Sequence, residues 1–330
     1  MNILITGFAG FIGKNLIKTL LIKYPNYQFV GLDNLTYASN SDSLSDFHYF
    51  DNFIFRRDDL NDMNAVSRLF NEFDFYGVIH LAAETHVDNS IIDPLLFART
   101  NVLGTLNLLE NCRLHWLDSS NRLFYHISTD EVFGSLFNVG SFNESTAYNP
   151  RSPYSASKAS SDHFVRAYHH TYGLPVVISN CSNNYGPYQH DEKLIPTVIR
   201  SIVNGQPIPV YGDGSNVRDW LFVGDHAAAI DLIFHKGQPG QTYCIGGDTE
   251  RTNLDLVRAL ITLTDEQLGN PNGYSESLIS FVPDRKGHDF RYAIDHTYIT
   301  NTLGWTPTTE FEDGLRQTVA YYVSRYMGKL

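Results

Sequence analysis

Three glycines near the N-terminus, Gly7, Gly10 and Gly13, directly follow an apolar, strand-like run, Asn2–Thr6. A helical segment, Phe11–Tyr24, begins within the same stretch. At such a junction the first glycine permits a tight turn and the second lets the backbone approach a pyrophosphate, while the third allows the helix to pack closely on the strand. The free amides at the helix N-terminus favour phosphate binding. The junction therefore predicts a dinucleotide-binding fold.

Strand-like apolar runs alternate with helical segments through the first half of the chain. Further strands are predicted at Gln28–Asp33, Asn52–Arg56, Gly77–Leu81, Leu123–Ser128 and Val176–Asn180, with helices at Met63–Phe73, Pro94–Leu114 and Tyr154–Tyr172. This alternation implies right-handed crossovers and a parallel sheet that is covered on both faces. We predict an α/β fold with a doubly wound parallel (Rossmann) sheet.

Glycine and proline interrupt the second half more often, and its elements are shorter. A chain of 330 residues commonly forms two lobes. We predict a cofactor-binding domain over residues 1–178 and mainly a smaller α/β substrate-binding lobe over residues 179–330, with residues near 218–236 returning to the first. The core of the smaller lobe is expected near Leu194–Gly205 and Asn253–Thr264.

Composition narrows the possible partners. The net charge of −12 argues against a nucleic-acid partner, and no apolar stretch has the roughly 20 residues of a membrane span. Three scattered cysteines, Cys112, Cys181 and Cys244, have neither zinc spacing nor a disulfide framework, and the thirteen histidines form no ligand pattern. The N-terminus carries no targeting signal. We expect a cytoplasmic protein without a metal ion.

Asp33 ends the second predicted strand, 20 residues after Gly13. A carboxylate at this position accepts hydrogen bonds from both ribose hydroxyls of a dinucleotide and repels the 2′-phosphate of NADP. The position therefore predicts NAD as the cofactor.

Tyr154 and Lys158 lie four residues apart in a predicted helix and so share one face. A free tyrosine has a pKa near 10, but a neighbouring ammonium and the positive nicotinamide favour its phenolate. Ser128 and Thr129 end a strand upstream, where a hydroxyl can bond the sugar oxygen that Tyr154 deprotonates. The alternative is an amphipathic helix with one exposed lysine. We interpret the residues as a hydride-transfer site.

Two adjacent acids, Asp130 and Glu131, follow Thr129. Adjacent carboxyls beside a hydride-transfer site are costly unless each has its own task, and elimination of water needs both a base and an acid. The alternative is a solvated pair that caps a helix or loop. Next to Tyr154 and Lys158, the pair favours dehydration.

These motifs resemble the extended nucleotide-sugar branch of the short-chain dehydrogenase/reductase superfamily. The similarity to its dTDP-glucose 4,6-dehydratase family spans nearly the whole chain, at His80–Ser90, Ser128–Gly134, Tyr154–Asp162, Asn180–Tyr188, Lys193–Pro196, Arg218–Leu221 and Asp284–Asp289. Epimerases of this branch usually lack the Asp-Glu pair, and UDP-glucuronate decarboxylases usually carry Ser-Glu. The alternatives are the same reaction on UDP-glucose or another nucleotide sugar, an epimerase or decarboxylase, and a non-catalytic NAD-binding regulator.

The resemblance implies a role for each residue of the site. Tyr154 would deprotonate the 4-hydroxyl while C4 gives its hydride to NAD, with Lys158 on the ribose and Thr129 on the sugar. Glu131 would take the C5 proton and Asp130 would protonate the leaving 6-hydroxyl. The hydride would then return to C6 to give dTDP-4-keto-6-deoxyglucose.

The resemblance also implies the binding residues. Those expected at the cofactor are Gly7, Gly10, Phe11, Ile12, Gly13, Asp33, Asn34, Leu35, Thr36, Asp59, Leu60, Leu81, Ala82, Ala83, Thr85, Thr100, Tyr154, Lys158 and Asn184. Those expected at the nucleotide sugar are Thr85, Thr129, Asn183, Lys193, Leu194, Ile195, Pro196, Val198, Pro209, Val210, Tyr211, Arg218, Asn253, Arg285 and His288. Lys286 stands where the family usually has proline, and it adds a positive charge near the diphosphate.

Two helices, near residues 94–114 and 154–172, carry apolar residues beyond a single stripe, among them Leu103, Leu106, Leu109, Phe164 and Val165. Such helices are either deeply buried in the monomer or paired at an interface. The family typically dimerises through these helices, so the resemblance implies a homodimer.

Overall fold

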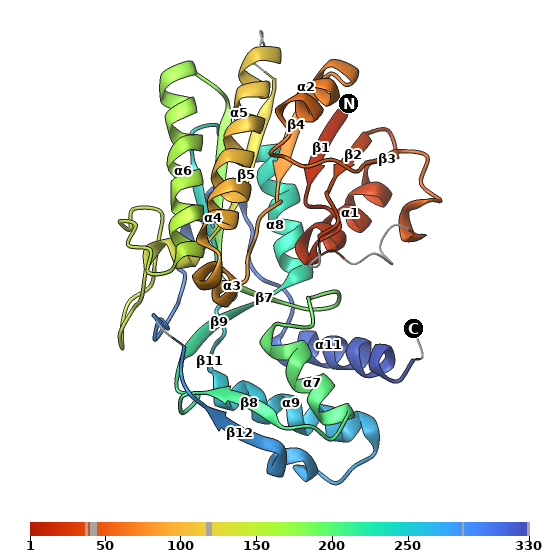
Figure 1. Ribbon diagram of the computed structural model, residues 1–330, viewed down its shortest axis with the longest axis vertical. Helices are drawn as coiled ribbons and strands as arrows, with labels where there is room; N and C mark the ends of the chain where they lie inside the picture. Colours follow the sequence, from red (N-terminus) through yellow and green to blue (C-terminus); the bar gives the residue numbers. More distant parts are fainter. Residues whose placement is uncertain (37–38, 40–44, 117–120, 286, 329–330) are drawn as a thin grey trace.

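A computed structural model of the chain describes residues 1–36, 39, 45–116, 121–285 and 287–328. In this part of the chain, seven parallel strands form a sheet in the order β10-β6-β5-β4-β1-β2-β3, in the upper half of Figure 1. The strands are β1 (Asn2–Thr6), β2 (Gln28–Leu32), β3 (Phe53–Arg56), β4 (Phe75–His80), β5 (Leu123–Thr129), β6 (Val176–Cys181) and β10 (Thr242–Ile245). The predicted doubly wound parallel sheet is confirmed.

Helices cover both faces of this sheet, as its apolar strands require. Ile3 and Ile5 of β1 belong to one core cluster, and Leu4 between them belongs to the other, because successive side chains point to opposite faces. The helices on the first face are α1 (Phe11–Lys23) and α8 (Val223–Lys236), and those on the second are α2 (Met63–Glu72), α5 (Gly104–His115) and α6 (Pro153–Tyr172). The strand ends are thereby held at fixed positions.

The predicted helix Pro94–Leu114 is interrupted in the structure. It consists of α4 (Pro94–Phe97), a π-helical segment (Ala98–Leu103) and α5, and a short α3 (Val87–Ile92) precedes it. The predicted helix Tyr154–Tyr172 is continuous. Ser152 caps its N-terminus, and Gly173 ends it in the left-handed conformation. None of the described helices is long and apolar enough to cross a bilayer.

The lower part of Figure 1 is built around a separate core. Its helices are α7 (Leu194–Val203), α9 (Asn253–Leu268) and α11 (Phe311–Tyr326), and they pack on one another through side chains such as Ile199, Val257 and Leu315. The remaining elements are β7 (Asn183–Tyr185), β8 (Ile208–Tyr211), β9 (Val217–Phe222), β11 (Glu250–Thr252), β12 (Ile279–Val282) and α10 (Thr297–Leu303). Strands β11, β9 and β7 form a small sheet that lies between this core and the large sheet (Figure 1).

Segments from the second half of the chain complete the large sheet. Helix α8, within the segment that we expected to return, packs on α1. Strand β10 also joins the sheet beside β6, although its four residues lie in the glycine-punctuated stretch and show no strand pattern in the sequence. The division at residues 178 and 179 stays a prediction.

Candidate active site

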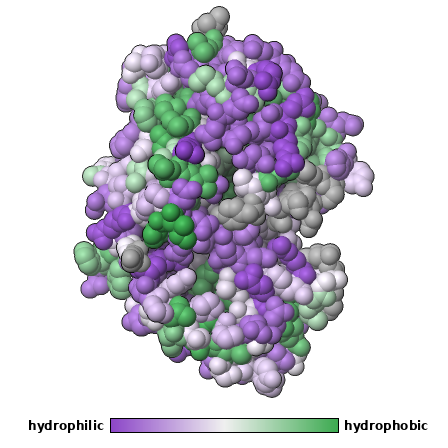
Figure 2. Space-filling view, viewed as in Figure 1, coloured by the Kyte–Doolittle hydropathy of each residue, from purple (hydrophilic) through white to green (hydrophobic). Residues whose placement is uncertain are grey.

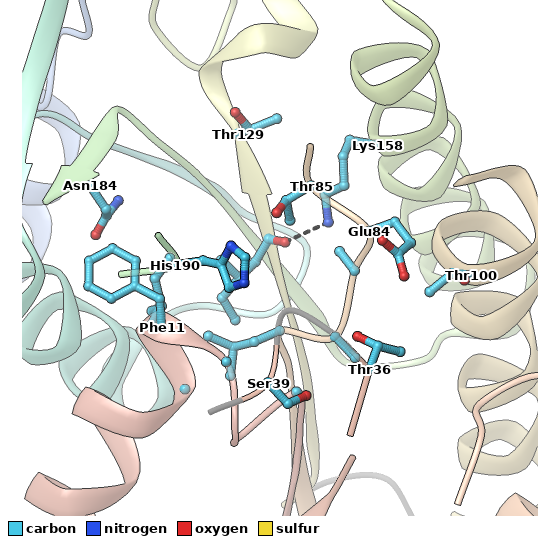
Figure 3. Close-up of a pocket in the computed structure, with 18 of the residues that line it drawn as sticks. Phe11, Thr36, Ser39, Glu84, Thr85, Thr100, Thr129, Lys158, Asn184 and His190 are labelled. Atoms are coloured by element: carbon cyan, nitrogen blue, oxygen red, sulfur yellow. Dashed lines mark hydrogen bonds between the residues drawn. The ribbon is translucent and has the colours of Figure 1, made fainter. Parts of the chain in front are cut away.

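A cavity of about 310 Å³ opens at the carboxyl ends of the parallel strands, where doubly wound folds bind ligands. Of the predicted site residues, it is lined by Gly7, Gly10, Phe11, Ile12, Gly13, Asp33, Asn34, Thr36, Asp59, Leu60, Leu81, Ala82, Ala83, Thr85, Thr100, Thr129, Asp130, Glu131, Tyr154, Lys158, Asn183, Asn184 and Lys193. Figure 3 shows Lys158 and Thr129 on one side of this space and Phe11 and Asn184 on another. The structure thus brings most of the predicted residues together.

Two glycines of the turn, Gly7 and Gly13, leave no room for a side chain. Gly7 has a φ of +71°, and a Cβ on it would lie 2.6 Å from the Ala82 nitrogen. A Cβ on Gly13 would lie 2.3 Å from the Gly7 carbonyl oxygen. Helix α1 therefore begins close against β1 and presents its free amides to the cavity, an arrangement that fits the pyrophosphate of a dinucleotide.

Asp33 ties the end of β2 to this turn. One carboxylate oxygen accepts the Ala9 amide at 3.1 Å, and the other accepts the Leu35 amide at 2.8 Å and the Ser39 hydroxyl at 3.0 Å. Burial raises the pKa of Asp33, and these hydrogen bonds oppose that change by stabilising the charged form. Leu35 contacts the site through its backbone and does not line the cavity.

Tyr154 and Lys158 lie on the first turns of α6 and are both buried. The Lys158 ammonium donates to the Ile127 carbonyl oxygen at 2.8 Å (Figure 3). Burial lowers the pKa of Lys158, whereas the charge of Asp162 raises it. Burial also raises the pKa of Tyr154 well above its usual value, and a hydrogen bond with Thr129 lowers it. The tyrosine therefore needs nearby positive charge to act as a base at neutral pH.

The Asp130–Glu131 pair begins a short 3₁₀ turn (Asp130–Phe133) that Thr129 caps at the end of β5. Burial, followed by the charge of Glu131, raises the pKa of Asp130 well above its usual value. Its Oδ2 is buried without a hydrogen-bond partner among the described residues. Burial raises the pKa of Glu131 too, but the charges of Arg218 and Lys193 lower it. The surroundings thus favour protonation of Asp130 more strongly than protonation of Glu131.

Of the predicted substrate residues in the second half of the chain, Asn183 and Lys193 line the cavity and the others do not. Arg218 donates to the carbonyl oxygens of Val217 and Asp289 at 2.7 and 3.0 Å, and Arg285 lies 4.8 Å from the Tyr211 ring centre. The predicted residues outside the lining are Leu35, Leu194, Ile195, Pro196, Val198, Pro209, Val210, Tyr211, Arg218, Asn253, Arg285 and His288. Ile195, Val198 and Val210 are core side chains. Lys286 lies outside the described residues.

The cavity is also lined by residues that the sequence did not place in the site, among them Glu84, Cys181, His190 and Glu192. Burial raises the pKa of Glu84, and the charge of Glu192 raises it further. The signal for Glu84 was its place in the His80–Ser90 motif, directly after a strand. Among the described residues, no group of three or more His, Cys, Asp or Glu side chains is arranged to hold a metal ion.

Comparison with known proteins agrees with this geometry. The family model described as GDP-mannose 4,6 dehydratase matches residues 4–318. The dTDP-glucose 4,6-dehydratase of Xanthomonas campestris is 50% identical over 97% of this chain and 93% of its own, and that of Salmonella typhimurium is 48% identical over 98% and 93%. The structure of the dTDP-glucose 4,6-dehydratase DesIV from Streptomyces venezuelae, with NAD and TYD bound, is 42% identical, with a TM-score of 0.90 over 98% of this chain and 97% of its own. The chain therefore belongs to the dTDP-glucose 4,6-dehydratase family, within the extended short-chain dehydrogenases/reductases.

Proposed function

We propose that this chain is an NAD-dependent dTDP-glucose 4,6-dehydratase. The observation that carries this proposal is the Asp130–Glu131 pair, which lines the same cavity as Tyr154 and Lys158. A dehydrogenase that only oxidises an alcohol needs no second acid–base pair. Two carboxyls whose pKa values are raised to different extents can supply the acid and the base of an elimination. The family membership agrees with this reading.

NAD fits the glycine turn and would accept a hydride from the sugar and later return it. The amides at the start of α1 would hold its pyrophosphate, because the turn excludes side chains there. Asp33 would accept the ribose hydroxyls at the end of β2. The remaining cofactor residues are those predicted from the sequence, and all of them except Leu35 line the cavity.

Oxidation at C4 requires removal of the proton from the 4-hydroxyl. Tyr154 would take this proton while the hydride leaves C4, and Thr129 would hold the hydroxyl oxygen. Lys158, which is buried and directed into the cavity, would stabilise the phenolate and bond the ribose (Figure 3). This step leaves a ketone at C4 that acidifies the proton on C5.

Elimination then removes the C5 proton and the 6-hydroxyl as one water. Glu131 would take the proton from C5, and Asp130 would give its proton to the departing hydroxyl. The hydride would then return to C6 and a proton to C5. The cofactor would thereby be regenerated and dTDP-4-keto-6-deoxyglucose formed. The sum of the steps is loss of one water, with no net oxidation.

Positive side chains from the lower part support a diphosphate substrate. Arg218 and Arg285 both lower the pKa of Glu131, so their charges reach the reacting end of the cavity. Arginine binds phosphate oxygens through paired donors. The Lys193 ammonium bonds the Thr85 carbonyl oxygen at 3.2 Å and so lies at the entrance to the sugar site. The other predicted substrate residues, apart from the core side chains Ile195, Val198 and Val210, would surround the nucleotide.

A product assay tests the proposed function. The purified protein is incubated with dTDP-glucose and, in parallel, with UDP-glucose, and the products are identified by mass. We expect dTDP-glucose to lose one water without accumulation of NADH. An isomer of unchanged mass would contradict the dehydratase function, and faster conversion of UDP-glucose would contradict the choice of nucleotide.

Replacing Asp33 by asparagine should weaken NAD binding by about ten- to a hundredfold, because charge-assisted hydrogen bonds contribute about 1.5–3 kcal/mol. Discrimination against NADP should shrink at the same time, since the repelling charge is gone. Calorimetric titration with both dinucleotides measures this change, with Asp51→Asn at an exposed position as the control. An equal loss of affinity for NAD and NADP would show that Asp33 acts only through the turn.

We also infer a homodimer that forms through α3 to α6. Leu109 and Val165 are buried in the monomer, whereas Ile92, Leu95 and Leu103 are exposed. Figure 2 shows apolar groups gathered over α3, α4 and α5. Leu103→Glu should therefore reduce the sedimenting mass by half, while Ile22→Glu, an exposed apolar position on α1, should leave it unchanged. A wild-type protein that sediments as a monomer would contradict the inference.

A cytoplasmic location is part of the same proposal. Cys112, Cys181 and Cys244 are buried free thiols, which suit a reducing compartment.

A further inference from the structure

A fully buried carboxylate, Asp162, lies on α6 one turn beyond Lys158. The Ser128 hydroxyl donates to its Oδ2 at 2.8 Å, and the Tyr148 hydroxyl donates to the same oxygen at 2.7 Å. The Asn180 amide approaches this oxygen at 3.4 Å and also donates to the Thr129 carbonyl oxygen at 3.0 Å. Asp162 therefore joins α6, which carries Tyr154 and Lys158, to the ends of β5 and β6.

The second oxygen of Asp162 and the Lys158 ammonium both approach the same ring nitrogen of His126. The His126 Nε2 lies 3.2 Å from Asp162 Oδ1 and 3.4 Å from the Lys158 ammonium. Burial lowers the pKa of His126 to about 4, so the ring is neutral at neutral pH. Lys158 is thus a cation, His126 a neutral ring and Asp162 an anion, and all three are buried.

We propose that Asp162 is a positioning residue for the Tyr154–Lys158 pair. Its carboxylate fixes α6 against β5 and β6, and it supplies a negative charge near the Lys158 ammonium, with His126 Nε2 in contact with both groups. The proposal rests on the proposed function, since it assigns Lys158 a working charge. A lysine in a dry site tends to lose its proton. With Asp162 ionised, the ammonium is retained and continues to favour the Tyr154 phenolate.

The charged and titratable groups around Asp162 come from several elements. They are His126 on β5, His80 behind it on β4, Tyr148 in the loop before α6, and Lys158 and Arg166 on α6 itself. Burial raises the pKa of Asp162, but hydrogen bonds with His126 and Tyr148 and the charge of Lys158 hold it below its usual value. Burial keeps His80 neutral, because it lowers the pKa of that ring well below its usual value. Asp162 is therefore the anion of this cluster.

Asp162→Asn tests the proposal, because it keeps the size of the side chain and an acceptor oxygen for Ser128 and Tyr148 but removes the charge. Asp265→Asn is the matched control: Asp265 is also fully buried on a helix and accepts two hydrogen bonds from Ser275, but it lies on α9 in the separate core of the lower part. Two quantities are measured: kcat for C4 oxidation against pH, and the titration of Lys158 by NMR of lysine-labelled protein without substrate.

In Asp162→Asn, we expect Lys158 to titrate at lower pH than in the wild type. The alkaline limb of kcat should move in the same direction, so that kcat falls to about one tenth or less of the wild-type value on the alkaline side. Asp265→Asn should leave both curves in place. An unchanged Lys158 titration, with or without a uniform loss of kcat at all pH values, would overturn the proposal, since a merely structural residue behaves in this way.

Two further measurements keep the outcome decisive. The NMR titration needs no substrate, so a wild-type protein that fails to convert dTDP-glucose would refute the proposed function without deciding the role of Asp162. If Asp162→Asn does not fold, carboxyl-labelled wild-type protein, assigned with Asp162→Glu, is titrated instead. The Asp162 carboxyl must then be ionised throughout the neutral range, and a protonated carboxyl there overturns the proposal.

Discussion

Tyr154→Phe is expected to lower kcat for C4 oxidation by about a thousandfold, within the 10²–10⁴-fold range of general base catalysis. The substitution removes only the hydroxyl and leaves the ring in contact with Phe97, at 6.3 Å between ring centres. Because the site then has no base at the 4-hydroxyl, transfer of the hydride from C4 becomes slow. Single-turnover absorbance of NADH measures the step directly, and NAD affinity should change little.

Tyr172→Phe is the matched control, since Tyr172 lies on the same helix but is 56% exposed and outside the cavity. It should retain wild-type turnover. If Tyr154→Phe still oxidises C4 at more than about a tenth of the wild-type rate, another group is the base and the assignment fails. Burial raises the pKa of Tyr154, so wild-type oxidation should gain speed as pH rises, until Lys158, whose pKa burial lowers, loses its proton.

Glu131→Gln and Asp130→Asn are expected to slow elimination by about 10²–10⁴-fold while C4 oxidation continues. Each substitution keeps the shape of the side chain and removes one proton-transfer partner. The ketone and NADH should therefore accumulate on the enzyme, and their absorbance should persist where that of the wild type decays. Burial raises the pKa of Asp130, so its protonated form persists to higher pH than that of a free aspartic acid and is lost as pH rises through the raised value.

Glu144→Gln provides the control for this pair. Glu144 is a half-buried carboxyl that does not line the cavity, and it accepts a hydrogen bond from the Cys244 amide at 2.8 Å. It should show normal decay of the absorbance. If both acid variants abolish formation of NADH to the same extent, the division between oxidation by Tyr154 and elimination by the acids is wrong. If neither variant accumulates NADH and both turn over normally, the pair has no part in elimination.

The fold was predictable where local pattern and burial agree. Strand β5 is buried along all seven residues, and the strand predicted at Leu123–Ser128 differs from it by one residue. Strand β10 was missed because four residues flanked by glycines carry too little pattern, and only pairing with β6 makes it a strand. The π-helical segment within the predicted helix Pro94–Leu114 was also missed, because apolar periodicity does not register a local change of hydrogen bonding.

The candidate site was predictable where residues are close in the chain. Tyr154 and Lys158 share a helix, and Thr129, Asp130 and Glu131 are consecutive. The sequence did not reveal that Arg218 and Lys193 act on the pKa of Glu131, because the three residues come from separate elements. The Asp162–His126 contact escaped for the same reason: one residue is on α6, the other is on β5, and only their packing joins them.

The central claim is that one hydride leaves C4, is held by the cofactor and returns to C6 of the same sugar. dTDP-glucose that carries deuterium at C4 tests it most directly, with the product analysed by NMR and mass spectrometry. We expect loss of one water, deuterium at C6, and a C5 hydrogen drawn from solvent. Deuterium that remains at C4, or that is lost to solvent with none at C6, would contradict it.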